Sequence, residues 1–327
     1  MIRFGVIGTN WITDSFLGAA NTIEDFSLTA VYSRTEERAK VFANKHHAPY
    51  TFTSIEEMAK SDLLDAVYIA SPTSFHASYA ISLLKHGKHV LCEKPIASNT
   101  SELMEMIKAA KENNVLLMEA LKSGFLPSYS SIRENLHKIG PVRRYFASYC
   151  QYSSRYDAYK EGNVLNAFKP EFSNGSLMDI GVYCIYPMVQ LFGKPDSIKA
   201  SGFMLNSGVD GEGAILAHYK DMEGTVMFSK ITNSYIPSEI QGEQGSILID
   251  KISEPEKVEI RYRDGRVEDI SKLPEQHTMY YETKEFIDLI KNGSLESNVN
   301  TYVNSIAVME ILDEARKQIG LVFPADK

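Results

Sequence analysis

The sequence predicts an α/β protein in which a doubly wound parallel sheet is followed by an α+β domain with a large, mainly antiparallel open sheet. Three observations support this class. The 327 residues suffice for two domains, because a domain usually has about 100–200 residues. Short β-branched runs alternate with longer amphipathic stretches over the first 120 residues, as in parallel strands joined by helices. Beyond residue 140, strand-like runs follow one another with few helices between them.

The first domain is assigned to residues 1–121. Capping-box spacings, at Ser33 with Glu36, Ser54 with Glu57 and Asn99 with Glu102, indicate helix starts between its strands. The predicted strands are Ile2–Ile7, Leu28–Tyr32, Ala66–Ala70, His89–Glu93 and Val115–Met118.

The second domain is assigned to residues 122–327. A helix over Ser128–Ile139 follows Pro127 and stops at Gly140, which marks the junction. The predicted strands are Val142–Cys150, Ser197–Met204, Ala214–Tyr219, Gly224–Lys230, Gly245–Asp250, Val258–Arg263 and Val267–Ile270, the last two joined by a type I′ turn at Asp264-Gly265. Further helices are predicted over Met178–Phe192, Met279–Asn292 and Tyr302–Ile319.

Composition excludes several classes of protein. Apolar residues make up 44% and charged residues 23%, as in ordinary globular proteins, and the net charge of −8 disfavours nucleic acid as a partner. Three cysteines without a C-x-x-C pair indicate neither a disulfide framework nor a zinc site, and no group of His or Cys offers three metal ligands. The N-terminus lacks a signal-peptide pattern, and no apolar run approaches the roughly 18 residues of a membrane span, so we expect a cytoplasmic protein without a membrane partner.

The turn after the first predicted strand has the features of a phosphate-binding loop. Gly8 permits a sharp turn that presents backbone amides, at the start of the next helix, to an anion. Asn10 replaces the second glycine of the dinucleotide fingerprint and Thr13 takes its third position, and asparagine tolerates left-handed backbone angles. The alternative is a turn from strand to helix that binds nothing.

The second predicted strand ends in Ser33-Arg34-Thr35, where an NAD-preferring site would carry an acid. A cation between two hydroxyls suits the 2′-phosphate of NADP, so NADP is favoured, with NAD as a possible second cofactor. Alternatively, Ser33 or Thr35 caps a helix and Arg34 is a solvated surface charge.

Two further segments carry ionisable groups. Lys94 follows Glu93 at the end of a buried strand and precedes Pro95. A lysine there could stabilise a developing negative oxygen, although a surface ion pair is the alternative. Asp179 and Tyr183 lie four residues apart at a helix start, hence on one face, so the phenol could exchange a proton while the carboxylate anchors a substrate hydroxyl. Alternatively, Asp179 stabilises the first helical turn and Tyr183 belongs to the core.

Together, in this order, these segments resemble the glucose-fructose oxidoreductase, inositol dehydrogenase and rhizopine-catabolism family, Gfo/Idh/MocA, over nearly the whole chain. With a tyrosine at 183, the sequence resembles the branch of this family that contains dimeric dihydrodiol dehydrogenases and glucose-fructose oxidoreductase. Members of that branch favour NADP. The matching residues also include Ser71-Pro72-Thr73 with His76, the segment 87–95, Met118-Glu119-Ala120, the segment 178–183 and Gly242-Glu243-Gln244-Gly245.

The resemblance implies an N-terminal Rossmann domain and a role for each matching residue. It implies a catalytic set of Lys94 and Tyr183 with Asp179 as their substrate-anchoring neighbour, and a cis peptide bond between Lys94 and Pro95. It implies a pyrophosphate turn of Gly8, Thr9, Asn10, Trp11 and Ile12, and a nicotinamide-side wall of Ser71, Pro72, Thr73, His76, Glu93, Lys94 and Pro95. The 2′-phosphate site of Ser33 and Arg34 is inferred from the residues, as described above.

We therefore expect an NADP-dependent oxidoreductase that transfers a hydride between nicotinamide and a secondary alcohol or carbonyl of a sugar, polyol or cyclic diol. No metal is expected, because Lys94 supplies the positive charge. A homodimer or tetramer through the C-terminal sheet is expected, because a sheet with helices on one side leaves its other face open. A non-catalytic NAD(P) sensor and a structural interaction protein are the alternatives; neither needs a proton donor beside the nicotinamide.

Overall fold

The computed structural model describes all of residues 1–327, and the chain divides into two compact units. The first unit comprises Met1–Lys122 and Gln276–Tyr302, and the second comprises Ser123–Glu275 and Val303–Lys327. Residues 276–302 were expected in the second domain, whereas in the structure they join the first unit. Helix α9 (Tyr280–Lys291) packs on α1 (Trp11–Ala20), and the Phe286 ring lies 6.0 Å from that of Phe4.

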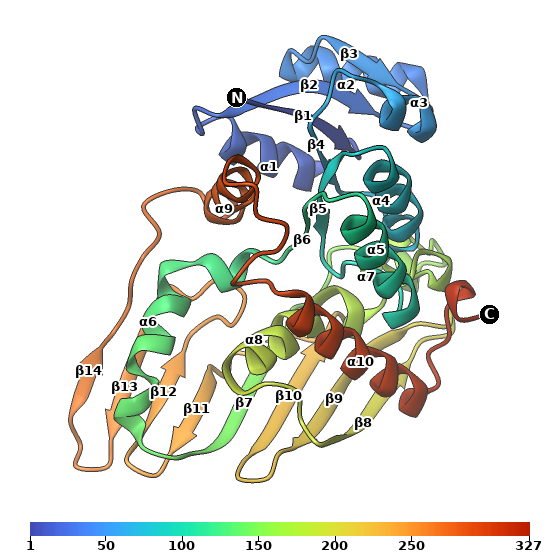
Figure 1. The fold of residues 1–327 in the computed structure, drawn as a ribbon. Coiled ribbons are helices and arrows are strands. Elements are labelled where there is room, and N and C mark those ends of the chain that lie inside the picture. The colour runs from blue at the N-terminus through green and yellow to red at the C-terminus, as the bar shows by residue number, and fades with distance from the viewer. The chain divides into compact units, whose positions relative to one another are not determined.

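The first unit is built on a six-stranded sheet in the order β3-β2-β1-β4-β5-β6, with all pairs parallel. The predicted doubly wound sheet is thus confirmed. Helices α1 and α9 lie on one side of the central strands and α4 and α5 on the other (Figure 1). The bounds are β1 Ile2–Ile7, β2 Phe26–Tyr32, α2 Glu36–His46, β3 Tyr50–Phe52, α3 Ile55–Lys60, β4 Ala66–Ile69, α4 His76–Lys85, β5 His89–Glu93, α5 Thr100–Glu112 and β6 Leu117–Ala120.

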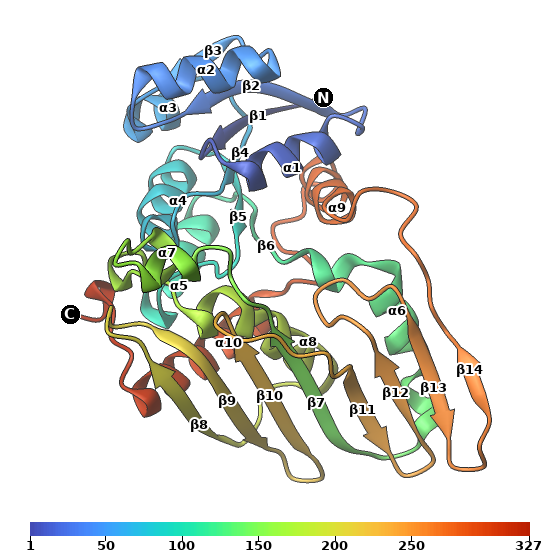
Figure 2. The same ribbon diagram turned by 180° about the vertical axis from the view of Figure 1, so that it is seen from behind.

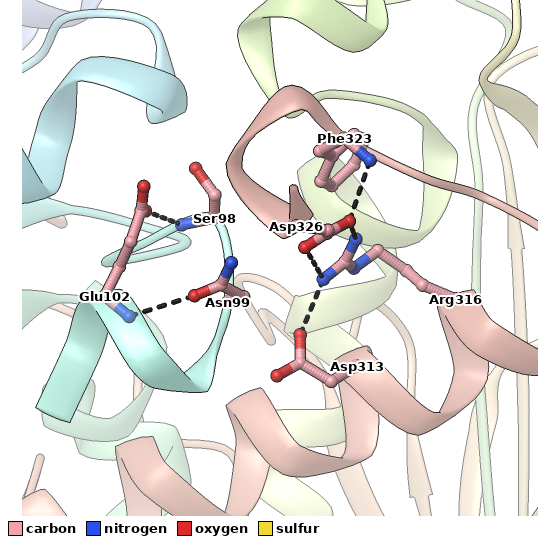
Figure 3. A network of polar contacts seen from close by, with 7 residues as sticks. All are labelled: Ser98, Asn99, Glu102, Asp313, Arg316, Phe323 and Asp326. Atoms are coloured by element: carbon pink, nitrogen blue, oxygen red, sulfur yellow. Dashed lines mark hydrogen bonds and ion pairs between the residues drawn. The ribbon is translucent and has the colours of Figure 1, made fainter.

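The local structure of this unit differs from the prediction in several places, including the bounds of β2 and β4. Strand β3 was not predicted, and the last strand begins at Leu117 rather than Val115, because Asn114 takes a left-handed conformation (φ 53°) and Val115 only leads the chain into the sheet. The caps at Ser54 and Asn99 are confirmed, and Figure 3 shows Asn99 bonded to the Glu102 amide. The cap at Ser33 is wrong, because α2 begins after Thr35 and has no side-chain cap.

The second unit is built on an eight-stranded sheet in the order β14-β13-β12-β11-β7-β10-β9-β8. Only the pair β7 and β10 is parallel, so the mainly antiparallel sheet is confirmed. Strand β11, which follows Pro237 and ends at Gly242, was not predicted. The strands are β7 Val142–Cys150, β8 Ser197–Met204, β9 Asp210–His218, β10 Glu223–Ser229, β11 Ser238–Gly242, β12 Gly245–Ile249, β13 Val258–Tyr262 and β14 Val267–Asp269.

Helices cover one face of this sheet. Figure 1 shows α6, α8 and α10 in front of the strands, and Figure 2 shows the opposite face, which carries none of them. The bounds are α6 Pro127–Asn135, α7 Tyr156–Lys160, α8 Val182–Phe192 and α10 Tyr302–Ile319, with a π-helical segment at Leu177–Gly181. The 3₁₀ turns of the chain are Thr73–Phe75 in the first unit and, from its end onward, Lys122–Phe125, Leu136–Ile139, Asn166–Phe168, Pro170–Phe172 and Pro324–Asp326. None of the helices has the length and apolar character needed to cross a membrane.

The hairpin between β13 and β14 does not contain the predicted type I′ turn. That turn needs a positive φ at two residues, and only Gly265 (φ 88°) has one. The Tyr262 N–H instead donates to the Arg266 carbonyl at 2.9 Å and the Gly265 N–H to the Tyr262 carbonyl at 3.0 Å. The connection is therefore a three-residue loop with its glycine in the left-handed position.

Arg316 fastens the end of the chain to α10. Its side chain is only 4% exposed, and its guanidinium donates to Asp313 at 2.7 Å and to Asp326 at 2.6 Å (Figure 3). The ring of Phe323 stacks 4.5 Å from the guanidinium carbon, and the Phe323 N–H also donates to Asp326. A buried guanidinium thus has two partners that compensate its lost hydration.

Candidate active site

The turn after β1 holds its shape through Gly8 and Asn10. Gly8 has φ +107°, and a Cβ there would lie 2.6 Å from the Ala70 carbonyl oxygen, so only glycine fits. Asn10 is extended (φ −118°), which corrects the expectation of a left-handed residue. Its side chain instead accepts a hydrogen bond from the Ile12 amide and donates to the Ala70 carbonyl, both at 3.0 Å. The turn is thus fixed against β4 with the positive end of α1 behind it, which fits a pyrophosphate.

A hollow of about 840 Å³ lies beside this turn at the end of β2. Its lining residues are Thr9, Arg34, Thr35, Glu37, Arg38, Val41 and Phe42. Ser33 is buried, and neither it nor Thr35 caps α2, so the capping alternative is set aside. Arg34 and Arg38 both line this hollow, and the charge of their side chains suits a phosphate.

His76 lies between two segments of the predicted nicotinamide wall and contacts the backbone of both. Its ring is 1% exposed, and its nitrogens lie 3.0 Å from the Pro95 carbonyl oxygen and 2.9 Å from that of Ser71. Burial lowers the pKa of His76, so the ring is neutral at neutral pH and donates one hydrogen bond. The neutral ring can donate to only one of these two carbonyl oxygens, and it contacts the other without a hydrogen bond.

Lys94 follows β5 beside a buried carboxyl group. The Tyr68 hydroxyl donates to Glu93 at 2.6 Å, and the Lys94 backbone N–H donates to the other Glu93 oxygen at 3.2 Å. Burial raises the pKa of Glu93, and the neighbouring Lys94 charge opposes that rise. The predicted cis bond between Lys94 and Pro95 is confirmed. Lys94 itself is half-buried, so its charge is partly shielded from water.

Glu282, on α9 in the same unit, is a second buried carboxyl group that the sequence analysis did not identify. Its side chain is 1% exposed, and both carboxyl oxygens lack a hydrogen-bond partner in the protein. Burial, together with the charge of Glu93, raises its pKa well above the ordinary value, while Lys122 opposes the shift. Glu282 is therefore expected to hold a proton at neutral pH.

Replacing Glu282 with glutamine is expected to make stability less sensitive to rising pH. The native state keeps this proton where the unfolded chain, with the ordinary pKa of 4.5, has released it. The free energy of unfolding therefore falls as pH rises from 4.5 to the raised pKa, and glutamine lacks this effect. Urea unfolding of both proteins at about pH 5 and about pH 8 measures the change. A difference between the two proteins that stays constant over this range would contradict the assignment.

The second unit carries Asp179 and Tyr183 at a break in helical geometry. Asp179 lies in the π-helical segment, and Tyr183 lies in the first turn of α8, which also contains Pro187. Proline at 187 has no N–H to donate to the Tyr183 carbonyl, so regular α-helical bonding is lost at this point. Such π-segments are frequent at functional sites. The Tyr183 ring packs edge-on against Tyr149 at 5.7 Å, and both Asp179 and Tyr183 remain partly exposed.

Lys230, which directly follows β10, forms an ion pair with Asp179. Its ammonium also lies 5.7 Å from the centre of the Phe168 ring. That ring in turn contacts Tyr156 at 5.7 Å and Tyr159 at 5.4 Å. The aromatic segment around α7 is therefore anchored beside Asp179.

Arg38, Lys230 and Glu282 were not identified from the sequence. Arg38 could have been found, because it lies in the first turns of the helix that follows Arg34. Lys230 shows the same signal as Lys94, a lysine at the end of a buried strand, although its partner is 51 residues away in sequence. Glu282 gave no signal, since a glutamate in an amphipathic helix is ordinarily solvated.

Sequence profiles of known families match most of the chain. The profile described as "Oxidoreductase family, NAD-binding Rossmann fold", GFO_IDH_MocA, matches residues 2–121. The profile described as "GFO/IDH/MocA C-terminal domain" matches residues 135–248.

Curated relatives match over their full length. The NADP(+)-dependent scyllo-inositol 2-dehydrogenase IolU of Bacillus subtilis is 60% identical over 327 residues, which cover 100% of both chains. The trans-1,2-dihydrobenzene-1,2-diol dehydrogenase of Xenopus laevis is 31% identical, covering 98% of this chain and 99% of that one.

Solved structures share the fold. KijD10, a 3-ketoreductase from Actinomadura kijaniata in complex with NADP and TDP-benzene, has a TM-score of 0.85 at 23% identity, covering 97% of this chain and 98% of that one. A levoglucosan dehydrogenase in complex with NADH and levoglucosan has a TM-score of 0.83 at 19% identity, covering 98% and 97%.

Proposed function

Because the chain belongs to the Gfo/Idh/MocA oxidoreductase family, we propose that it is an NADP-dependent dehydrogenase of cyclic polyols, with scyllo-inositol as its substrate. The observation that carries this choice is the 60% identity, over the whole of both chains, to a scyllo-inositol 2-dehydrogenase that uses NADP(+). The broader assignment, an NADP-dependent oxidoreductase of sugars or polyols, also agrees with the dihydrodiol dehydrogenase relative. A non-catalytic sensor is therefore set aside.

The cofactor half of the chemistry is assigned to the first unit. The glycine turn suits the pyrophosphate, and the hollow with Arg34 and Arg38 suits the 2′-phosphate. When bound, NADP accepts or gives the hydride. Lys94 stabilises negative charge that develops on the substrate oxygen, and its half-buried position strengthens that effect.

The substrate half is assigned to the second unit. In reduction, Tyr183 gives its phenolic proton to the oxygen that Lys94 stabilises, and in oxidation it takes that proton back. Asp179 accepts a hydrogen bond from a substrate hydroxyl, which fits a polyol with several neighbouring hydroxyls. The partly exposed Asp179 and Tyr183 are accessible to such a ligand, as these roles require.

The substrate is tested by following NADPH absorbance with scyllo-inositol, myo-inositol, levoglucosan and an aromatic trans-diol. The expected result is NADP⁺ reduction with scyllo-inositol at a kcat/KM above that for every other compound. Turnover of levoglucosan or the diol alone would overturn the choice of substrate, while leaving the oxidoreductase class in place.

Replacing Arg34 with alanine is expected to weaken NADP binding by roughly 10- to 150-fold, because charge-assisted hydrogen bonds to the phosphate are lost. NAD lacks this phosphate, so its affinity should stay nearly unchanged and serves as the internal control. Nicotinamide fluorescence measures both dissociation constants. An equal loss for the two cofactors would place Arg34 away from the 2′-phosphate.

The expected assembly is a homodimer, or a dimer of dimers, through the uncovered face of the eight-stranded sheet in the cytoplasm. Four large apolar side chains are exposed on strands of this sheet: Phe203 (58%), Leu216 (59%), Met227 (37%) and Val267 (61%). Light scattering is expected to give a dimer or tetramer at micromolar concentration, and a smaller species for Leu216→Asp. A wild-type monomer at that concentration would contradict this assembly.

A further inference from the structure

Lys230 is a buried lysine in the substrate half that the proposed chemistry does not use. Its side chain is 6% exposed, whereas that of its ion-pair partner Asp179 is 35% exposed. The backbone on either side is fixed, because the Lys230 N–H donates to the Gly211 carbonyl at 2.9 Å and its carbonyl accepts from the Ser153 amide at 2.8 Å. Such a lysine is retained only where partners compensate the cost of burying its charge.

The ammonium group of Lys230 contacts the carboxylate of Asp179 and an aromatic ring. One side of the group meets the Asp179 carboxylate, and another faces the Phe168 ring, whose centre is 5.7 Å away. Phe168 is itself fully buried and closes that side with an apolar surface. With 6% exposure, little of the ammonium is open to a ligand, so Lys230 acts through the carboxylate it holds.

The segment that carries Asp179 is fixed from a second side by Asp210 on β9. Asp210 is fully buried and accepts a hydrogen bond from the Leu177 amide at 2.7 Å, at the start of the π-helical segment. Gly175 (φ +139°) allows the backbone to approach Asp210 closely, because a Cβ there would lie 2.1 Å from the Asp210 carboxylate. Burial raises the pKa of Asp210 to about 6, and the Lys230 charge opposes that rise. The Lys230 charge therefore acts on two carboxyl groups, that of Asp210 on β9 and that of Asp179 in the π-helical segment.

We propose that Lys230 is a positioning residue that holds the Asp179 carboxylate, ionised and in one orientation, for the substrate hydroxyl. The proposal rests on the proposed function, in which Asp179 anchors the polyol. An ionised carboxylate only accepts hydrogen bonds, so it selects a hydroxyl at the position it faces. Without the ammonium, the carboxylate loses a partner that fixes this orientation, and the selection is weakened.

The test compares Lys230→Met, Lys230→Arg and Asp179→Asn with the wild type, using scyllo-inositol and NADP⁺. Lys230→Met is expected to raise the KM for scyllo-inositol about tenfold to a hundredfold, as the loss of a charge-assisted hydrogen bond does. The KM for NADP⁺ should change less than about twofold, and Lys230→Arg, which keeps the charge, should restore part of the loss. Lys194→Met is the matched control, because it removes an exposed lysine that pairs with Glu310 in the same unit.

The double variant Lys230→Met with Asp179→Asn separates positioning from a general structural role. If Lys230 acts through Asp179, the double variant should be no worse than Asp179→Asn alone in its KM for scyllo-inositol. Three results would each overturn the proposal. In the first, the rises in KM for scyllo-inositol of the two single variants multiply in the double variant. In the others, Lys230→Met leaves the KM for scyllo-inositol unchanged, or raises the KM for NADP⁺ by the same factor. Lys230→Arg keeps the test valid if the methionine variant does not fold.

Failure of the proposed function has a separate signature. It would be seen in the wild type, as a lack of NADP⁺ reduction with scyllo-inositol, before any variant is compared. In that case the KM of each Lys230 and Asp179 variant is compared with that of the wild type for the polyol or sugar that the enzyme does convert. The crystal structure of Lys230→Met gives a readout that needs no activity: Asp179 is expected in a new orientation, and an unmoved carboxylate would overturn the proposal.

Discussion

Replacing Lys94 with alanine is expected to lower turnover by about 10² to 10³, the range found when a preorganised donor to a developing negative oxygen is removed. The half-buried position of Lys94 and its placement after β5 put a fixed charge at the carboxyl edge of the parallel sheet, where ligands of open α/β sheets bind. Cofactor affinity should change much less, because the cofactor phosphates are assigned to other residues.

The matched control is Lys85→Ala, which removes an exposed lysine from α4 of the same unit. Its turnover should equal that of the wild type. Steady-state rates at saturating NADP⁺, with nicotinamide fluorescence for the dissociation constant, give both quantities. Turnover near the wild-type value in Lys94→Ala would show that the catalytic site has been placed wrongly.

The fold of the first unit was predictable because its information is local. Each strand is a short apolar run, and each helix start at Ser54 and Asn99 has a capping residue whose hydrogen bond involves an amide three residues on. Strand β3 was missed because it has only three residues, and β11 because Ile240 is its one apolar side chain; pairing with neighbouring strands stabilises both. The return of residues 276–302 to the first unit depends on contacts such as Phe286 with Phe4, which no local pattern reveals.

The candidate site divides in the same way. Gly8, Lys94 and Tyr183 lie in motifs of a few residues, so the sequence indicates them directly. The role of Asn10 was misjudged because its partner, the Ala70 carbonyl, is 60 residues away. The ion pair of Lys230 with Asp179 and the unpartnered carboxyl of Glu282 arise only from tertiary packing. Sequence motifs thus identify the reacting groups, while the residues that position them require the structure.

Replacing Tyr183 with phenylalanine is expected to lower turnover by about 10² to 10⁴, because the proton donor to the substrate oxygen is lost while the ring and its packing on Tyr149 remain. The alkaline limb of the pH profile should flatten, since the titrating phenol is gone. The loss should not multiply with that of Lys94→Ala in the double variant, because two groups that serve one oxygen act as a unit.

A competing assignment makes Lys94 the proton donor and Tyr183 a positioning group. In that case Tyr183→Phe would keep the pH profile of the wild type, and its turnover would fall only by a modest factor. The pH profile of Lys94→Ala would instead lose its alkaline limb. Turnover measured against pH for both single variants, with cofactor saturating, decides between the two. The comparison is sharp because phenylalanine removes one hydroxyl group from position 183 and keeps the ring that packs on Tyr149.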